Sequence, residues 1–256
     1  MKDSIKIAIV GKGGTGKTVI SALLAKLIIQ EYDYKLLLID ADPAHPHLSN
    51  MVNVNPKKSL ESVRMELIKR TINKDSDVDE IIKDIDYDMY DALIENKDFC
   101  LFWIGQPEGP GCFCPSNLIL KKTIDLISQD FEMILIDCEA GLEQVNRLVI
   151  ENVDIIAIIV DPSIRSIETA VSIRKNSKKF VKNDSLEIIL NRAKGSLDKI
   201  KNKIKELNFE LYGVIPEDEE ISKLDLIGMP IIKISDNSTS YEKIKEIFPR
   251  MVKLRE

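Results

Sequence analysis

Short apolar runs alternate with stretches of helical periodicity along nearly the whole chain, and several runs consist almost entirely of Ile, Leu and Val. Runs without polar alternation are typical of parallel strands that are covered on both faces. The stretch between the first two runs, residues 19–29, has the pattern of a buried helix. The pattern predicts a doubly wound, mainly parallel α/β sheet with helices on both faces. The expected strands cover residues 5–10, 35–39, 99–104, 133–136, 155–160, 186–190, 211–215 and 231–234.

No internal repeat, Gly/Ser-rich linker or low-complexity tract divides the chain, so we expect one domain over residues 1–256. Residues 75–95 depart in composition, because they are rich in Asp and Glu with Tyr and Met interleaved. We expect this segment to form helices at one edge of the sheet. A solvated acidic face is favoured there over a partner-docking surface.

Composition narrows the class of protein. The chain has 256 residues, of which 44% are hydrophobic and 30% charged, as in ordinary globular proteins. A net charge of -6 argues against broad binding to nucleic acid or anionic membranes. The first strand begins almost at once, and the apolar run at 155–160 is too short to span a bilayer. We therefore expect a cytoplasmic protein with no membrane or nucleic-acid partner, whose four cysteines are thiols or metal ligands.

A glycine-rich loop between the first strand and the first helix matches G-x-x-x-x-G-K-[ST], the phosphate-binding loop. Its glycines let backbone N–H groups face a polyphosphate. Lys17 would reach the outer phosphates and Thr18 would hold Mg²⁺. Lys12 is surplus to this template and suggests chemistry at the γ-phosphate, in this site or in that of a partner subunit. The alternative is a glycine-rich turn without a ligand. The expected nucleotide-binding residues are Gly11, Lys12, Gly13, Gly14, Thr15, Gly16, Lys17, Thr18 and Val19.

Carboxylates follow two other predicted strands. Asp40 and Asp42 end the run at 35–39, and Asp137 ends the run at 133–136 in the Walker B manner. Such aspartates hold Mg²⁺ or position an attacking water. An Asp at a strand end also caps turns, so neither site is specific alone. Together with the loop they make ATP hydrolysis the best interpretation.

The segment 12–18 resembles the deviant Walker ATPases, a group that includes MinD, ParA, the nitrogenase iron protein and metal-insertion proteins. The resemblance implies a P-loop fold and an ATP-sandwich homodimer in which Lys12 enters the partner's site. It also implies that Asp42 orients the attacking water, that Asp40 is its magnesium-side companion and that Asp137 is the Walker B residue.

The same resemblance implies that Asn191, Arg192, Pro216 and Glu217 line the adenine base. Val19 departs from the family pattern, because relatives often carry a hydroxyl there that meets the α-phosphate. We expect backbone N–H groups to make that contact instead, with the chemistry intact.

A C-x-C pair, Cys112 and Cys114, lies in a loop rich in Gly and Pro. Two thiolates leave a four-coordinate soft metal half-ligated, and a twofold dimer would supply the other two. The alternative is a pair of partly buried loop cysteines.

The segments 107–114 and 137–143 resemble those of the CooC-type ATPases that mature nickel carbon monoxide dehydrogenase, and of the related acetyl-CoA synthase factors. This implies ATP-dependent nickel delivery to, or insertion into, the nickel–iron–sulfur cluster of such a client enzyme. Nickel would lie between the Cys112 and Cys114 thiolates of both protomers, with zinc able to compete.

Three other functions stay open. The first is an iron–sulfur electron-transfer ATPase like the nitrogenase iron protein, although its two cysteines per chain come from separate regions. The second is a MinD- or ParA-like positioning ATPase. Membrane-bound members need a C-terminal amphipathic anchor, which we expect Pro249 and poor segregation of basic and apolar residues to prevent in the final segment. The third is a nucleotide switch with a C-x-C redox sensor.

Four further side chains are weaker candidates for chemistry. Cys100 lies in an apolar strand and is expected to be a buried, inert thiol. Nothing in the sequence supports a redox role for Cys138, in the expected switch. His45 and His47 follow Asp42, and an exposed or phosphate-neighbouring position is favoured for them over a metal site.

Overall fold

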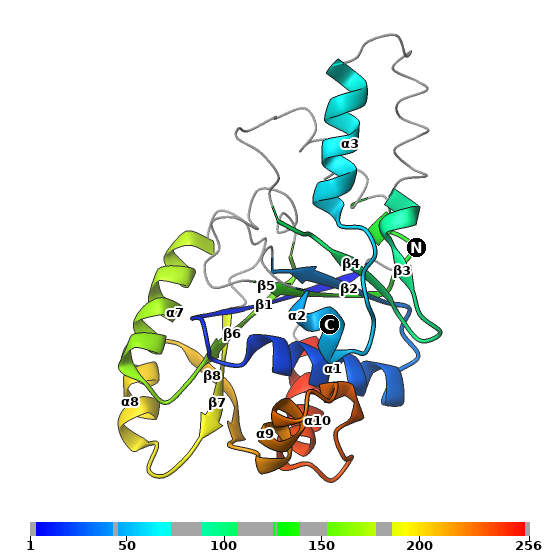
Figure 1. Ribbon diagram of the computed structural model, residues 1–256. Coiled ribbons are helices and arrows are strands. Elements are labelled where there is room, and N and C mark those ends of the chain that lie inside the picture. Colours follow the sequence, from blue (N-terminus) through cyan, green and yellow to red (C-terminus); the bar gives the residue numbers. More distant parts are fainter. Residues whose placement is uncertain are drawn as a thin grey trace.

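An eight-stranded sheet forms the centre of the molecule, and the computed structural model describes it within residues 4–42, 46–72, 89–106, 125, 127–138, 153–177 and 186–253 (Figure 1). The strand order is β3-β4-β2-β5-β1-β6-β7-β8. All neighbours are parallel except β3 and β4. The strands are β1 (Ile5–Gly11), β2 (Leu36–Ala41), β3 (Ile94–Glu95), β4 (Cys100–Trp103), β5 (Met133–Cys138), β6 (Ile155–Val160), β7 (Leu186–Ala193) and β8 (Glu210–Pro216).

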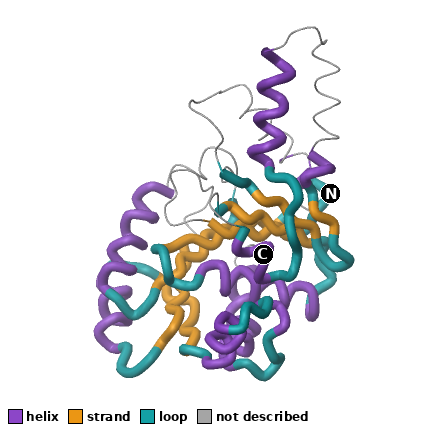
Figure 2. Tube along the Cα trace, in the orientation of Figure 1, coloured by secondary structure: helices purple, strands orange, loops and turns teal. Residues whose placement is uncertain are grey.

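Helices cover both faces of this sheet, which confirms the predicted doubly wound α/β fold (Figures 1 and 2). One face carries α1 (Lys17–Glu31), α2 (His47–Met51), the 3₁₀ helix η1 (Ile231–Lys233) and α10 (Thr239–Lys253), with α9 (Glu219–Leu226) packed against η1. The other face carries α7 (Ile164–Ser177), α8 (Asp198–Glu206) and the start of α3 (Leu60–Ile72). The rest of α3 extends beyond the sheet.

The central strands are buried on both sides, and β2, β5 and β6 are buried at every position. Because successive side chains in a strand point to opposite faces, Ile7 and Ile9 of β1 join the core under α1 and α10. Ala8 and Val10 join the core under α7 and α8. Two cores explain why these strands appear in the sequence as unbroken apolar runs.

Strand register places the chemistry at one edge of the sheet. Ile9 pairs with Asp137, and Asp137 pairs with Asp40 on the other neighbouring strand. The loop after β1 therefore begins beside both carboxylates, at the carboxyl ends of parallel strands where doubly wound folds bind ligands.

The prediction of a strand at residues 231–234 is wrong, because the chain forms the 3₁₀ helix η1 there. Ile231 and Ile234 are both buried, at a spacing of three that suits a 3₁₀ turn, and they join the core beneath α1. The acidic segment at 75–95 is also only partly as expected. Residues 89–92 are helical, but Ile94–Glu95 forms the antiparallel edge strand β3. Residues 73–88 lie outside the described part.

The expectation for the C-terminal segment is wrong in its details. Pro249 lies within α10, which continues to Lys253. Apolar residues recur on a single face of α10, and that face is buried in the core against α1 and β8 rather than left for a membrane. In the described ranges, no helix has the length and apolar character needed to cross a bilayer.

Candidate nucleotide site

The loop between β1 and α1 requires glycine at two positions. Gly16, directly before α1, has φ +89°, and a Cβ there would lie 2.5 Å from the Asn191 amide nitrogen. A Cβ on Gly11 would lie 2.3 Å from the carbonyl oxygen of Ile159. Because these positions lack a Cβ, the loop can curve and can lie close to the neighbouring strands β6 and β7.

Hydrogen bonds within the loop hold its shape. The carbonyl oxygen of Lys12 accepts bonds from the Thr15 amide (3.3 Å), the Thr15 hydroxyl (2.9 Å) and the Lys17 ammonium (3.3 Å). Lys17 is 8% exposed and so lies over the loop rather than in solvent. The helix α1 begins at Lys17 with no side-chain cap and no acidic residue in its first turn, which leaves its positive end for an anion.

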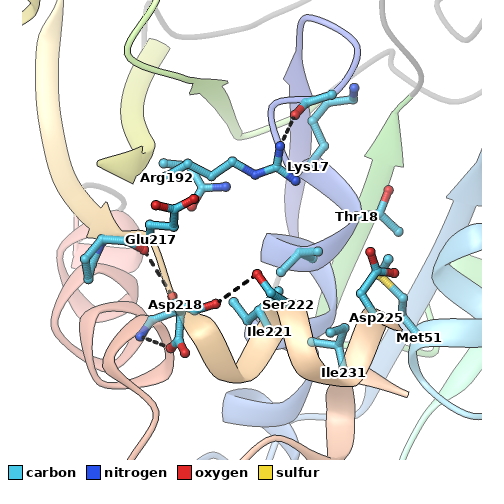
Figure 3. Close-up of a pocket in the computed structure, with 16 residues that line it drawn as sticks. Lys17, Thr18, Met51, Arg192, Glu217, Asp218, Ile221, Ser222, Asp225 and Ile231 are labelled. Carbon is cyan, nitrogen blue, oxygen red and sulfur yellow. Dashed lines mark hydrogen bonds between the residues drawn. The ribbon is translucent and has the colours of Figure 1, made fainter. Parts of the chain in front are cut away.

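The end of β7 braces this loop from the other side. The Asn191 amide donates to the Thr15 carbonyl oxygen at 2.8 Å, and the Arg192 guanidinium donates to the Gly14 carbonyl oxygen at 2.9 Å. Figure 3 shows Arg192 reaching across to the loop. The structure thus brings this predicted pair to the nucleotide loop, where its hydrogen bonds are made to the loop backbone.

Asp137 is a buried carboxylate beneath the start of α1. It accepts a hydrogen bond from the Ser21 hydroxyl at 2.9 Å, and the Thr18 hydroxyl also bonds to it. Burial raises the pKa of Asp137 to about 6, although these hydroxyls and the Lys17 charge act in the opposite direction. Sequence reasoning missed Ser21. The feature of the sequence that could have indicated its role is its position one helical turn after Lys17.

Asp40 is fully buried and is held by α2. The Ser49 amide and hydroxyl each donate to it at 3.1 Å, and the Asp42 amide donates at 3.4 Å. Burial raises the pKa of Asp40 to about 7, the Ser49 bonds oppose this rise, and the Asp137 charge adds to it. Two buried carboxylates with raised pKa values, next to each other in register, form a site that favours a bound cation.

Asp42 lies where β2 ends. Its carbonyl oxygen accepts a hydrogen bond from the Trp103 indole at 3.0 Å, which fixes the backbone at this point. His47 is exposed at the start of α2, as expected. His45 lies outside the described residues.

A cavity of about 470 Å³ opens beside the loop (Figure 3). Pro216 and Glu217, which the resemblance assigned to the base, line this cavity. The helix α9 provides a wall that sequence reasoning missed, because nothing in its pattern marks a helix of the binding site. The lining residues are Gly14, Gly16, Lys17, Thr18, Val19, Met51, Asn191, Arg192, Pro216, Glu217, Asp218, Ile221, Ser222, Asp225, Ile231 and Ser240.

The cysteines divide into two groups. Cys112 and Cys114, like residues 139–143 of the expected switch, lie outside the described part. Cys138 is buried and Cys100 half-buried, and burial raises the pKa of both thiols, so neither favours the thiolate form. Among the residues that the structure describes, no group of three or more His, Cys, Asp or Glu is arranged to hold a metal ion.

Comparison with known proteins places this geometry in a family. Residues 6–231 match the model of the CobQ/CobB/MinD/ParA nucleotide-binding domain. The chain belongs to this family. An uncharacterised ATP-binding protein of Methanocaldococcus jannaschii is 34% identical over 251 residues, which cover 96% of this chain and 98% of that protein. With these relatives, the chain is a P-loop ATPase of the MinD/ParA type.

Two further proteins are similar to the chain. The carbon monoxide dehydrogenase accessory protein CooC of Rhodospirillum rubrum is 28% identical over 250 residues, which cover 90% of each chain. The structure of the septum site-determining protein MinD from Pyrococcus horikoshii, complexed with Mg-ADP, superposes with a TM-score of 0.71. It is 22% identical and covers 99% of this chain and 98% of that one, so it supports the fold.

Proposed function

We propose that the chain is an ATP-dependent metallochaperone that delivers nickel to the nickel–iron–sulfur cluster of a carbon monoxide dehydrogenase or acetyl-CoA synthase. ATP binds between the loop 11–19 and the cavity wall, with Asn191, Arg192, Pro216 and Glu217 at the nucleoside end. Lys17 and the start of α1 hold its phosphates, because this is the cationic end of the cavity. We place the protein in the cytoplasm, where its client would fold.

The carboxylate edge fits Mg²⁺. Asp137 is buried, hydrogen-bonded to Thr18 and adjacent to Asp40, so a cation would offset the cost of two buried negative charges. Thr18 and Asp137 would hold the ion, with Asp40 behind them. Bound Mg²⁺ would neutralise the charge on the phosphates. Asp42, half-exposed at the end of β2, would orient the attacking water.

Lys12 extends this site to a second protomer. Its backbone carbonyl oxygen shapes the loop, and its side chain is not needed for that role. We assign the ammonium group of Lys12 to the γ-phosphate in the partner's site of a homodimer, where it stabilises the charge of the transition state.

The nickel proposal is carried by one observation, the C-x-C pair in a chain that aligns with CooC over most of its length. Cys112 and Cys114 supply two sulfurs, and a twofold axis brings two more from the partner to make the four-coordinate site of a soft metal. ATP-driven closure of the dimer would then control capture and release of the metal.

Metal titration of the purified dimer tests this assignment. We expect about one Ni²⁺ per two chains for the wild type and loss of binding in Cys112→Ala/Cys114→Ala. Cys100→Ser, which alters a half-buried strand thiol, is the matched control and should bind normally. Full stoichiometry in the double variant would refute the site. A brown, oxygen-sensitive protein after anaerobic purification would favour the iron–sulfur alternative.

A MinD- or ParA-like positioning ATPase is the second candidate, since the matching family includes both groups. The burial of the apolar face of α10 in the core counts against an anchor made from that helix. ATP-dependent cosedimentation with anionic liposomes or with DNA, unaffected by nickel and by the Cys112→Ala/Cys114→Ala change, would favour this function over metal delivery.

A further inference from the structure

The cavity wall that faces away from the phosphate loop is assembled from three segments. These are the β8–α9 junction at Pro216–Asp218, the first turns of α9, and the start of α10 at Ser240. Figure 3 shows Asp218, Ile221 and Ser222 side by side along this wall. If ATP binds as proposed above, the phosphates occupy the loop end and the nucleoside lies against this wall.

The carboxylate of Asp218 joins all three segments. One oxygen accepts the Glu220 amide at 2.9 Å and so caps α9. The other accepts the Ser238 hydroxyl at 2.7 Å, the Thr239 hydroxyl at 3.1 Å and the Ser240 amide at 2.9 Å. In addition, the Ser240 hydroxyl donates to the Pro216 carbonyl oxygen at 3.4 Å, which closes the connection between α10 and the end of β8.

The four bonds accepted by Asp218 favour its ionised carboxylate. Burial by itself raises the pKa of Asp218, but the bonds from Ser238, Ser240, Glu220 and Thr239 outweigh it and lower the pKa below the ordinary value. An asparagine offers one accepting oxygen and turns an NH₂ group toward donors at its other end. It could therefore keep either the α9 cap or the α10 connection, but not both.

We propose that Asp218 is a positioning residue that sets the affinity of the cavity for the nucleoside half of the nucleotide, and not for the phosphates. The inference rests on the proposed nucleotide function. Asp218 acts through the wall, because its oxygens are occupied by α9 and α10. The phosphate loop is shaped by its own bonds and by Asn191 and Arg192, so it keeps its geometry when this wall loosens.

Binding of Mg-ADP and of Mg-pyrophosphate, measured by calorimetry on the whole chain, separates these two halves. For Asp218→Asn we expect ADP affinity to fall at least about fivefold while pyrophosphate affinity stays within about twofold, since a connection worth about one hydrogen bond is lost. The KM for ATP should rise while kcat changes less than about twofold. Glu219→Gln, the same change one residue away on a 92% exposed side chain, is the control and should match the wild type.

Other outcomes would overturn the proposal. Equal losses for ADP and pyrophosphate would show general loosening, and unchanged ADP affinity would show that the wall does not need Asp218. Should Asp218→Asn fail to fold, Ser238→Ala removes one of the four donors to Asp218, together with the acceptor of the Tyr241 amide at 3.2 Å, from outside the cavity lining. It should give a smaller loss with the same selectivity for ADP. A wild-type protein that binds neither ligand would refute the proposed nucleotide function, and with it this inference. If the wild type binds both ligands but the variants do not behave as predicted, only this inference fails and the proposed nucleotide function stands.

Discussion

At the scale of single residues, the phosphate edge holds two carboxylates where burial opposes ionisation. Asp137 is 2% exposed and Asp40 is fully buried, and they are neighbours in register on β5 and β2. Hydroxyls of Thr18, Ser21 and Ser49 solvate them in place of water. Burying these two negative charges costs free energy in the ligand-free protein, and a bound cation would reduce that cost. We therefore expect the two carboxylates to lower the stability of the ligand-free protein while they favour cation binding.

Replacing Asp137 with Asn should therefore stabilise the ligand-free protein at high pH. The pKa of Asp137 rises from 3.8 to about 6 on folding, so its ionisation destabilises the fold increasingly as pH rises from 3.8 to 6. Asp137→Asn should gain up to about 3 kcal/mol in free energy of unfolding at pH 8 and about half of that at pH 5. Urea denaturation in EDTA measures both. Asp130→Asn, on an exposed turn, should show no such trend, and a less stable Asp137→Asn protein at pH 8 would contradict the prediction.

Lys17 should affect mainly nucleotide binding, and Lys12 should affect mainly the rate of hydrolysis. Lys17→Ala should weaken Mg-ADP binding by roughly 30-fold, because a charge-assisted contact worth about 2 kcal/mol is removed. Lys12→Ala should bind Mg-ADP within about threefold of the wild type but lose about 10³-fold in kcat, as expected for a cation supplied by a partner. Calorimetry measures the ADP affinity and phosphate release measures kcat. Equal effects of both changes on ADP binding would show that Lys12 serves its own site. Lys57→Ala, on an exposed side chain, is the control.

At the scale of elements, α1 connects the phosphate end of the site to its far wall. Lys26 is buried on α1, where its ammonium group donates to the Ile234 carbonyl oxygen, pairs with Asp236 at 2.8 Å and lies 4.8 Å from the centre of the Tyr241 ring. One side chain thus holds together α1, the turn after η1 and the first turn of α10. These are the elements that place the cavity wall against the loop.

Lys26→Met should test this connection, because it keeps the stem and removes the charge. It leaves the Ile234 carbonyl oxygen without this donor, and we expect the free energy of unfolding to fall by about 1–3 kcal/mol. Lys223→Met, which removes an exposed pair with Glu219 at 3.8 Å, should cost less than about 0.5 kcal/mol. Similar values for the two variants in chemical denaturation would show that Lys26 contributes no more than a surface charge.

Elements with unbroken apolar runs were mostly predictable from sequence, including the partly exposed edge strand β8, whereas η1 and the contacts between distant segments were not. The central strands and α1 follow from long apolar runs, and Lys17, Thr18 and Asp137 follow from spacing within motifs at their ends. By contrast, η1 has the same Ile-rich composition as a strand, and only its packing against α1 decides its form. Ser21, Ser49 and Asp218 act through contacts between distant segments, which no local pattern records.

At the scale of the whole molecule, one sheet edge collects the residues of this chain that we assign to the ATPase reaction. The loop after β1, the carboxylates at the carboxyl ends of β2 and β5, the bracing residues near the end of β7 and the cavity-lining end of β8 converge because all five strands run parallel. Lys12 and the pair Cys112 and Cys114 are the parts of the proposal that a single chain leaves incomplete. Both would acquire a role in the proposed homodimer, where two protomers meet about a twofold axis.

Native mass spectrometry of the wild-type protein with Ni²⁺, with and without a non-hydrolysable ATP analogue, tests metal delivery by an ATP-controlled dimer most directly. We predict a species of two chains, two nucleotides and one nickel ion, which is absent from Cys112→Ala/Cys114→Ala at equal nucleotide occupancy. A nucleotide-bound dimer that carries no nickel, or nickel bound one per chain to monomers of both proteins, would contradict the account.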